Sequence, residues 1–515
     1  MDLKRLKGIR VGVSLLFLGV FGFLFLDVGN IVPPALTNVL VSLQIVPALT
    51  KSIVSVGIWS GGAAVVLLLT LAFGRVYCSS ICPLGTLQDV VIRFAQKWNR
   101  RRRFRFTPPR YVLHYALLGL ALALFLAGSL VLLNLLEPFS NFGRMIQGIV
   151  RPVVVGANNG IAEVTGWFGF YGLYRIPFRP IDPVIVAMPV LFLGLLAYLS
   201  YNHGRLFCNL LCPAGALLGL VSRVSLFRIV VDKSTCMECG LCERVCKAGC
   251  IDSDNMKIEF SACVSCFNCI KACPTIGLKY EGLFGKRSGS IVPGADEGRR
   301  RIILGSLAPI ALLAGTSIDS VSKGPVRKRE EHPVTPPGSQ SILHFSGHCT
   351  ACHLCVSQCP TQVLSPSFLD YGIGGIFQPR MDYHASYCNY DCNICGTVCP
   401  TGAILAVPLA DKRLIQMGKA QFVKDDCIVI TKKTDCGACS EHCPTKAVYM
   451  IPHEKLFLPE VNNDICVGCG ACEHSCPTKP RKAIYVESNP LHLKAQKPQI
   501  KKLEQPTEKA TDFPF

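Results

Sequence analysis

Residues 236–246, CMECGLCERVC, carry a regular pattern of cysteines. Its four cysteines follow the spacing C-x2-C-x2-C-x3-C, and CVSCFNCIKACP at 263–274 repeats that spacing with a proline after the last cysteine. In such paired runs, three thiolates on a tight loop hold one face of a [4Fe–4S] cube and the fourth reaches the partner cube. A zinc site would use two separated C-x2-C pairs instead. The two runs therefore predict two iron–sulfur clusters.

The spacing also assigns the ligands of these two clusters. We expect Cys236, Cys239, Cys242 and Cys273 to hold one cluster, and Cys263, Cys266, Cys269 and Cys246 to hold the other.

Four further runs lie between residues 346 and 496, which predicts six clusters in all. Two runs depart from the strict spacing, which loop insertions after their first cysteines explain, because DDC at 425–427 parallels DIC at 464–466. The expected ligands are Cys349, Cys352, Cys355 and Cys359; Cys388, Cys392, Cys395 and Cys399; Cys427, Cys436, Cys439 and Cys443; and Cys466, Cys469, Cys472 and Cys476. The four runs can pair as neighbours, or first with fourth and second with third.

Segments such as CPTQVL, CPTGAI and CPTKAV follow the runs and resemble one another. Such repetition indicates duplicated half-ferredoxins, each a short helix and a hairpin beside one cube. Cys250 aligns with the alanines of these segments, so we expect it to fill a small apolar position.

Apolar segments at 11–26, 53–73, 111–136 and 183–199 predict four membrane helices. Half of the 515 residues are hydrophobic and 17% are charged, which agrees with a membrane location. The net charge of +19 lies largely beside these segments, as at 100–105 and 299–301, where the positive-inside rule expects it. We therefore expect no nucleic-acid partner.

The distribution of basic residues predicts the topology. The N-terminus and the 74–110 loop are expected in the cytoplasm of a multi-pass protein of the inner (cytoplasmic) membrane. A fifth apolar segment would place the C-terminal clusters on the periplasmic side. The expected multidomain organisation is a membrane domain at 1–228, a cytoplasmic two-cluster α+β ferredoxin-like domain at 229–290, the fifth segment at 291–320, a linker at 321–345, an external four-cluster domain at 346–496 and a tail at 497–515.

A second cysteine pattern stands at the ends of two predicted membrane helices. GRVYCSSICPLG at 74–85 and GRLFCNLLCPAG at 204–215 share glycine, arginine, an aromatic residue, C-x3-C, proline and a second glycine. We expect the two hairpins to pack around a pseudo-twofold axis, so that four thiols converge: Cys78, Cys82, Cys208 and Cys212. These thiols would bind a further [4Fe–4S] cluster or form a redox-active set; the alternative is that they pack as small apolar residues.

These motifs carry a family resemblance. Residues 1 to about 290 resemble the NapH-type membrane ferredoxins, which oxidise quinol for periplasmic nitrate reductase. Residues 298 to about 490, with RRRIILG before an apolar run and four cluster motifs, resemble the NapG-type partner that the twin-arginine route exports. The arginines at 299–301 could equally be a positive-inside flank. The resemblance implies a fusion of the two proteins.

The resemblance implies a quinol dehydrogenase component. Menaquinol or another quinol from the quinone pool would be oxidised, and electrons would pass through the clusters to a periplasmic reductase or cytochrome. The alternative is a transmembrane conduit from a cytoplasmic donor to an external acceptor or to a metal centre under assembly, without quinol chemistry. His114 and His203, at ends of predicted membrane helices, are candidates for a quinone or proton role. The catalytic residues and the direction of electron flow stay open.

Overall fold

The N-terminal part of the chain is helical. The computed structural model describes residues 3–27, 29, 31–54, 61–98, 104–169, 171–172, 174–177, 183–275, 277–282 and 333–497. Its helices up to residue 222 are α1 (Leu3–Leu26), α2 (Pro34–Ser42), α3 (Ile45–Val54), α4 (Gly61–Phe73), α5 (Val76–Ser80), α6 (Pro83–Trp98), α7 (Tyr111–Leu126), α8 (Val131–Leu136), α9 (Pro138–Met145), the π-helix η2 (Ile146–Val150), α10 (Arg151–Trp167), α11 (Pro183–His203), α12 (Leu206–Leu210) and α13 (Pro213–Ser222).

Among the described residues, α1 and α11 are long and apolar enough to cross a membrane, and the pair α2 and α3 qualifies as a third span if its 107° bend is counted within one span. The predicted single span at 111–136 is divided: α7 ends at Leu126, Gly128 adopts a left-handed conformation with φ of +79°, and α8 begins at Val131. The described part of the predicted span at 53–73 is mainly the shorter apolar helix α4. The expected fifth segment at 291–320 lies outside the described residues.

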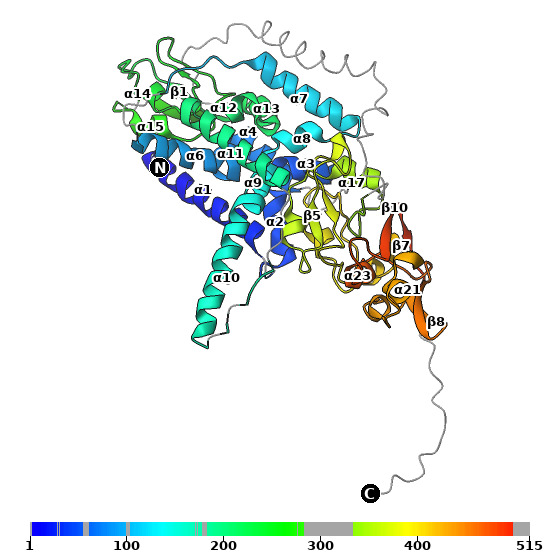
Figure 1. Cartoon of the computed structure of the whole chain (residues 1–515). Helices are drawn as coiled ribbons and strands as arrows, with labels where there is room; N and C mark the ends of the chain where they lie inside the picture. Colours follow the sequence, from blue (N-terminus) through cyan, green and yellow to red (C-terminus); the bar gives the residue numbers. More distant parts are fainter. Residues whose placement is uncertain are drawn as a thin grey trace, which may run out of the picture.

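Residues 227–282 form a small α+β unit, which we call the first cysteine unit. Its elements are β1 (Phe227–Val231), α14 (Leu241–Arg244), β2 (Ile251–Asp252), β3 (Lys257–Ile258), α15 (Asn268–Ala272) and β4 (Leu278–Gly282). Strands β1 and β4 pair antiparallel, with Val231 opposite Leu278, and so bring the two ends of the unit together. The unit lies beside the N-terminal end of α1 (Figure 1).

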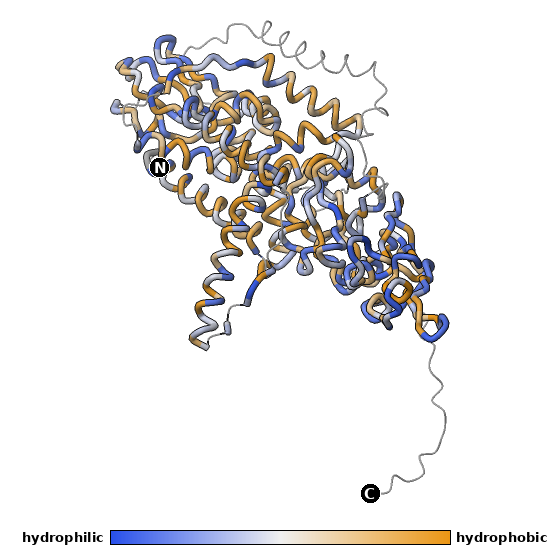
Figure 2. Tube along the Cα trace, viewed as in Figure 1, coloured by the Kyte–Doolittle hydropathy of each residue, from blue (hydrophilic) through white to orange (hydrophobic). Residues whose placement is uncertain are grey.

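Residues 333–497 form the second cysteine unit. Its elements are α17 (Ile342–His348), α18 (Leu354–Ser357), β5 (Leu364–Pro366), η4 (Ile373–Gly375), β6 (Pro379–Met381), α19 (Ile394–Val398), α20 (Leu409–Lys412), β7 (Ile415–Phe422), η5 (Lys424–Asp426), α21 (Ile428–Thr431), α22 (Ala438–Glu441), β8 (Val448–His453), β9 (Leu456–Val461), α23 (Ala471–Ser475) and β10 (Ile484–Lys494). The described strands form two-stranded antiparallel pairs, β5 with β6, β7 with β10 and β8 with β9. Figure 2 shows this unit as more hydrophilic than the helices of the N-terminal part.

The two cysteine units lie against opposite ends of the helical part (Figure 1). The second unit contacts the C-terminal end of α1, where the side chain of Gln358 donates to the carbonyl of Leu24 at 2.9 Å. It also contacts α2, where Asn38 donates to the carbonyl of Thr397 at 2.5 Å. The helical part therefore stands between two cysteine-rich units.

Candidate iron–sulfur sites

The four strict cysteine runs share one backbone geometry. In each C-x2-C-x2-C loop, the residues on both sides of the middle cysteine have positive φ: Glu238 and Gly240, Ser265 and Phe267, Ala351 and His353, and Gly468 and Gly470. Left-handed residues on both sides of one cysteine curl the loop so that three thiols face one side. At Gly470 the glycine is also required by space, because a Cβ atom would lie 2.0 Å from the Tyr383 ring.

The first cysteine unit brings its thiols together in the two predicted sets. Cys236, Cys239, Cys242 and Cys273 line one cavity. A second cavity is lined by Cys246, Cys263, Cys266 and Cys269. Both cavities are otherwise mainly apolar, and every cysteine of the chain is free. Four free thiols around a cavity fit a [4Fe–4S] cube, in which each thiolate binds a different iron.

The described residues contain no group of three or more His, Cys, Asp or Glu side chains placed to hold a single metal ion.

Cys250 lies against the second of these sets, in agreement with the small apolar position that its alignment with the repeat alanines predicts. It is 2% exposed, its Sγ atom is 3.5 Å from that of Cys246, and it lines the same cavity. In each of the other five runs, a threonine two residues after the last cysteine lies near that cysteine's Sγ, as in Cys476 and Thr478 at 3.0 Å. Cys246 is followed by Lys-Ala-Gly-Cys, so Cys250 takes the place of the threonine hydroxyl.

In the second unit, neighbouring runs exchange their last cysteines. The thiol of Cys399 lies close enough to Cys349, Cys352 and Cys355 to raise their pKa values. The thiol of Cys359 instead raises the pKa values of Cys388 and Cys395 in the next run. The same exchange joins the last two runs, since Cys476 acts on Cys427 and Cys439, and Cys443 on Cys466, Cys469 and Cys472. The structure thus selects the neighbour pairing from the two that the spacing allowed. It also brings Cys427 to its set, although eight residues, which include α21, separate it from Cys436.

Burial makes these bare thiols weak acids. It raises the pKa of Cys352 to about 12 and the pKa of Cys388 to about 11. Iron binds thiolates, so loading the sites would displace protons from the protein. Burial also lowers the pKa of His353 to about 3, and the ring Nε2 atom lies 2.7 Å from the carbonyl of Phe377. The His353 imidazole is therefore neutral, and its Nε2 atom donates to that carbonyl.

The two C-x3-C-P motifs meet as a reciprocal pair in the helical part. The guanidinium of Arg75 donates to the carbonyl of Cys208 at 3.1 Å, and that of Arg205 donates to the carbonyl of Cys78. The second glycine of each motif leaves room for this contact. A Cβ atom on Gly85 would lie 2.2 Å from the Cys78 carbonyl oxygen, and one on Gly215 would lie 2.1 Å from the Cys208 carbonyl oxygen.

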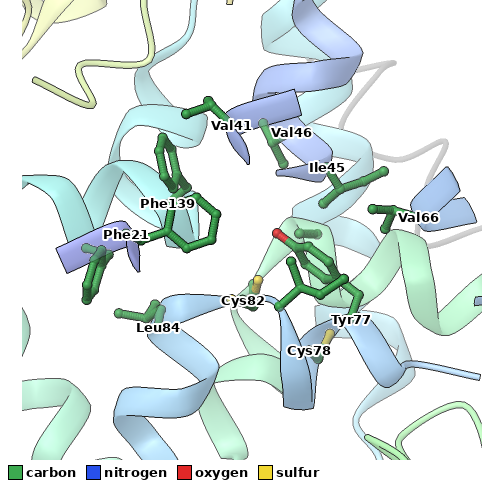
Figure 3. Close-up of a cluster of buried hydrophobic side chains, with 14 of the residues drawn as sticks. Phe21, Val41, Ile45, Val46, Val66, Tyr77, Cys78, Cys82, Leu84 and Phe139 are labelled. Carbon is green, nitrogen blue, oxygen red and sulfur yellow. The ribbon is translucent and has the colours of Figure 1, made fainter. Parts of the chain in front are cut away.

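The four motif cysteines are buried together. Cys78, Cys82, Cys208 and Cys212 are 4–6% exposed and act electrostatically on one another. Figure 3 shows Cys78 and Cys82 in one core with Tyr77, and Phe207 of the other motif belongs to the same core. We call these four residues the membrane cysteine site.

Buried cations surround the membrane cysteine site. Arg75 and Arg205 are fully buried, and one carboxylate, Asp89 of α6, pairs with Arg205 at 2.7 Å, with Arg10 at 3.0 Å and with Lys247 of the first unit. Arg75 bonds to Asn209, at 2.8 Å, and to backbone carbonyls, but it has no carboxylate partner among the residues that the structure describes.

A buried cation is costly unless an anion compensates it. Cysteines that only filled space would leave this charge uncompensated, whereas four thiolates around an iron–sulfur cluster would balance it. The charge distribution therefore fits a cluster at the membrane cysteine site better than it fits packing. Spacing could not reveal Asp89, because its three partners come from three distant parts of the chain.

The two histidines proposed for a quinone or proton role, His114 and His203, lie in different surroundings. His114 is buried beside the membrane cysteine site, with its Nε2 atom 3.3 Å from the carbonyl of Cys212. His203 is the last residue of α11 and is exposed.

Three family models match the chain. Two separated segments, 56–101 and 184–232, match a 4Fe-4S binding domain, and their only cysteines are the four of the membrane cysteine site. A 4Fe-4S dicluster domain matches 348–403 and 433–479, and another 4Fe-4S dicluster domain matches 255–360. The segments 348–403 and 433–479 contain, respectively, the first two runs of the second unit and most of the last two.

Curated proteins resemble parts of the chain. The chain is 30% identical to protein NirI of Paracoccus denitrificans over 214 residues, which are 41% of this chain and 26% of NirI. It is 27% identical to YccM of Escherichia coli over 214 residues, which are 40% of this chain and 51% of YccM. The ferredoxin-type protein NapH of Haemophilus influenzae is 24% identical over 288 residues, 54% of this chain and 85% of NapH.

The chain thus spans about half the length of YccM and about a quarter of NirI. No solved structure matches the chain. The cysteine runs, the helices and these similarities agree: the chain is a polyferredoxin-like [4Fe–4S] membrane protein.

Proposed function

We propose that the protein moves electrons across a membrane between its first and second cysteine units, with the membrane cysteine site as the step between them. One observation carries this proposal. A single buried core contains Cys266 of the first unit, the four cysteines of the membrane site and Cys352 of the second unit. When bound, [4Fe–4S] clusters accept and donate single electrons. The candidate ligand sets are those given above, seven in all with the membrane site.

The residues of the chain have definite tasks in this proposal. Gly74 and Gly204, both left-handed, let the two motifs approach the first unit closely: a Cβ atom on Gly204 would lie 2.2 Å from the Lys247 carbonyl oxygen. Arg75 and Arg205 hold the two motifs together and bring buried positive charge to the membrane site. That charge favours the more negative, reduced state of a redox group there. Asp89 joins this site to the first unit through Lys247.

The test is electron flow through the protein in sealed liposomes. A low-potential viologen donor is placed on one side and a membrane-impermeant acceptor on the other, and reduction of the acceptor is followed by absorbance. We expect flow in the wild-type protein and a loss of at least about tenfold in Cys208→Ser. The matched control is Val190→Ser, on the exposed surface of α11, which should keep the flow. Equal flow in Cys208→Ser and wild type would reject the membrane site as a step.

A second candidate function is quinol oxidation with electrons delivered to an external reductase of the nitrate-reductase type. Oxidation of a quinol to a quinone releases two electrons and two protons; the electrons would enter the second unit singly and the protons would leave to water. This function is considered because a hollow lies between the helical part and the second unit. Adding a reduced menaquinone analogue to the oxidised protein should bleach its iron–sulfur absorbance. If the menaquinone analogue does not bleach the absorbance but a low-potential donor does, quinol oxidation is rejected and only the electron conduit remains.

A further inference from the structure

A hollow of about 850 Å³ lies between the helical part and the second unit. This volume is within the range of small-molecule sites. One wall comes from α9, η2, the start of α10 and the first half of α11; the opposite wall comes from the second unit, including β5. In Figure 1 these elements meet where α10 leaves the body of the molecule.

The charges that line the hollow are divided unequally between its two walls. The wall from the helical part contributes Arg144 and Arg151, and none of the residues that the structure describes on this wall is acidic. The wall from the second unit contributes three cations and three carboxylates, which are Arg380, Arg481, Lys482, Asp370, Asp382 and Glu473. The charges of the second unit thus cancel, whereas the helical wall carries two positive charges. An anion in the hollow is therefore attracted to the helical wall.

The carboxylates of the second unit have partners within that unit. Asp370 pairs with Arg380 at 3.0 Å. The side chain of Glu473 accepts from the backbone N–H of Val486 at 2.8 Å, and that of Asp382 accepts from the backbone N–H two residues further along the chain at 3.2 Å. The second unit therefore balances its own charges, and the arginines of the helical wall stay as the positive side of the hollow.

A buried donor on the helical wall lacks a partner. Arg144 is 4% exposed, and its Nη2 atom donates to the carbonyl of Asn134 and to the side chain of Asn141 at 2.9 Å. Glu137 interacts with the guanidinium electrostatically, but both of its carboxylate oxygens accept backbone N–H groups at the start of α9. The Nη1 atom of Arg144 has no hydrogen-bond partner among the described residues. An unsatisfied buried guanidinium nitrogen is costly, and an acceptor oxygen from a bound molecule would satisfy it.

The hollow also adjoins an apolar surface. Ile185 and Pro189, at the start of the candidate membrane span α11, line it. The neighbouring side of α11 exposes Val184, Leu191 and Leu195, which follow one another at intervals of seven and four residues and so lie on one face of the helix. A molecule with its charged group at Arg144 can therefore lay apolar chains along α11.

We propose that this hollow binds the phosphate group of an anionic phospholipid, with Arg144 Nη1 as a donor to a phosphate oxygen and the acyl chains against α11. Guanidinium groups form strong, charge-assisted hydrogen bonds with phosphate. A free phosphate ion would use the arginines alone, whereas a phospholipid uses both the arginines and the apolar face. The inference goes beyond the proposed electron transfer, which requires no lipid at this place.

The test is native mass spectrometry of the full-length, iron-loaded protein, freed of lipid in detergent and titrated with phosphatidylglycerol. We expect one tightly bound phosphatidylglycerol per chain, bound at least about fivefold more tightly than phosphatidylcholine with the same acyl chains. Inorganic phosphate at the same concentration should not displace it. Arg144→Gln should weaken the binding about tenfold, because one charge-assisted hydrogen bond to the phosphate is lost.

The matched control is Arg175→Gln. It removes the same charge from the helical part, but Arg175 pairs with Glu163 at the surface and does not line the hollow, so the binding should be unchanged. Iron content shows whether each variant folds. If Arg144→Gln does not fold, Arg151→Gln removes the other arginine of the helical wall and should weaken the binding at least about threefold.

Four outcomes would overturn the inference. Unchanged binding of phosphatidylglycerol to a folded Arg144→Gln or Arg151→Gln variant would place the lipid elsewhere. Equal binding of phosphatidylcholine would mean that the hollow holds acyl chains without recognising an anion. Displacement by inorganic phosphate would assign the hollow to a free anion, and tighter binding of a menaquinone analogue would assign it to the quinol of the second candidate function. The liposome assay with the viologen donor is read independently, so its failure would reject the conduit and leave the lipid result standing.

Discussion

The membrane cysteine site and the ferredoxin-type sets gather four thiols in different ways. In the four strict runs, three of the thiols come from seven consecutive residues, curled by two left-handed residues. In the membrane site, the thiols come in pairs from two motifs about 130 residues apart in the chain, and two buried arginines cross-link the motifs. The first kind of site depends on local backbone geometry, whereas the second depends on tertiary charge placement.

The iron content of a Cys208→Ser variant tests whether the membrane cysteine site holds iron, as the ferredoxin-type sets are expected to. Replacing Cys208 by serine should remove about four irons per chain, because one [4Fe–4S] cluster loses a ligand while the sets in the two cysteine units are untouched. Iron and acid-labile sulfide of the purified protein measure this. Val190→Ser should keep the wild-type content. An unchanged iron content in Cys208→Ser would mean that the membrane thiols carry no cluster.

A substitution of Asp89 tests how much the buried charges around the membrane cysteine site contribute to stability. Asp89→Asn leaves three buried cations, Arg10, Arg205 and Lys247, without their shared carboxylate. Breaking a buried ion pair costs about 3–5 kcal/mol, so the free energy of unfolding in detergent should fall by that order. The matched control is Asp391→Asn, which removes a solvent-exposed pair with Arg413 and should cost below about 1 kcal/mol. Equal losses in the two variants would contradict the bridging role of Asp89.

The same contrast explains what the sequence could predict. The candidate ligand sets of the first unit follow from spacing, because one short loop holds each set of three. The choice between neighbouring and nested pairs in the second unit depends on how the loops pack, and spacing is silent about that. The division of the segment 111–136 at Gly128 and the bend between α2 and α3 were missed because hydropathy averages over a window and does not register one left-handed glycine.

For Cys250, the alignment with the repeat alanines predicted a small apolar position, but it did not predict the contact of its Sγ atom with that of Cys246. A weak signal was present for Cys250, because threonine follows the last cysteine in each of the other five runs but not in this one. The assigned positions of the domains relative to the two sides of the membrane stay predictions.

Arg75 and Arg205 differ in their partners within the membrane cysteine site. Arg205 pairs with Asp89, but Arg75 has no carboxylate partner in the described part of the chain, so only anionic thiolates would compensate it. Arg75→Gln should therefore destabilise the iron-loaded protein more than the iron-free protein, by roughly 1.5–3 kcal/mol. Thermal unfolding of both forms measures the difference. A loss of the same size in both forms would assign Arg75 a packing role only.

One hydrogen bond joins the second unit to α1 at the seam, the contact between Gln358 and Leu24. Gln358 is one residue before Cys359, yet its side chain leaves the second unit and donates to the Leu24 carbonyl near the C-terminal end of α1. Gln358→Ala should cost about 1 kcal/mol of stability, since it leaves a buried carbonyl without its donor. The exposed Gln421→Ala, which loses a bond to Glu487, is the control and should cost less. Because Cys352 and the membrane cysteine site share one core across this seam, electron flow in Gln358→Ala liposomes should fall while iron content stays constant. Unchanged flow would mean that the second unit keeps its place without this bond, and that the shared core alone fixes the path.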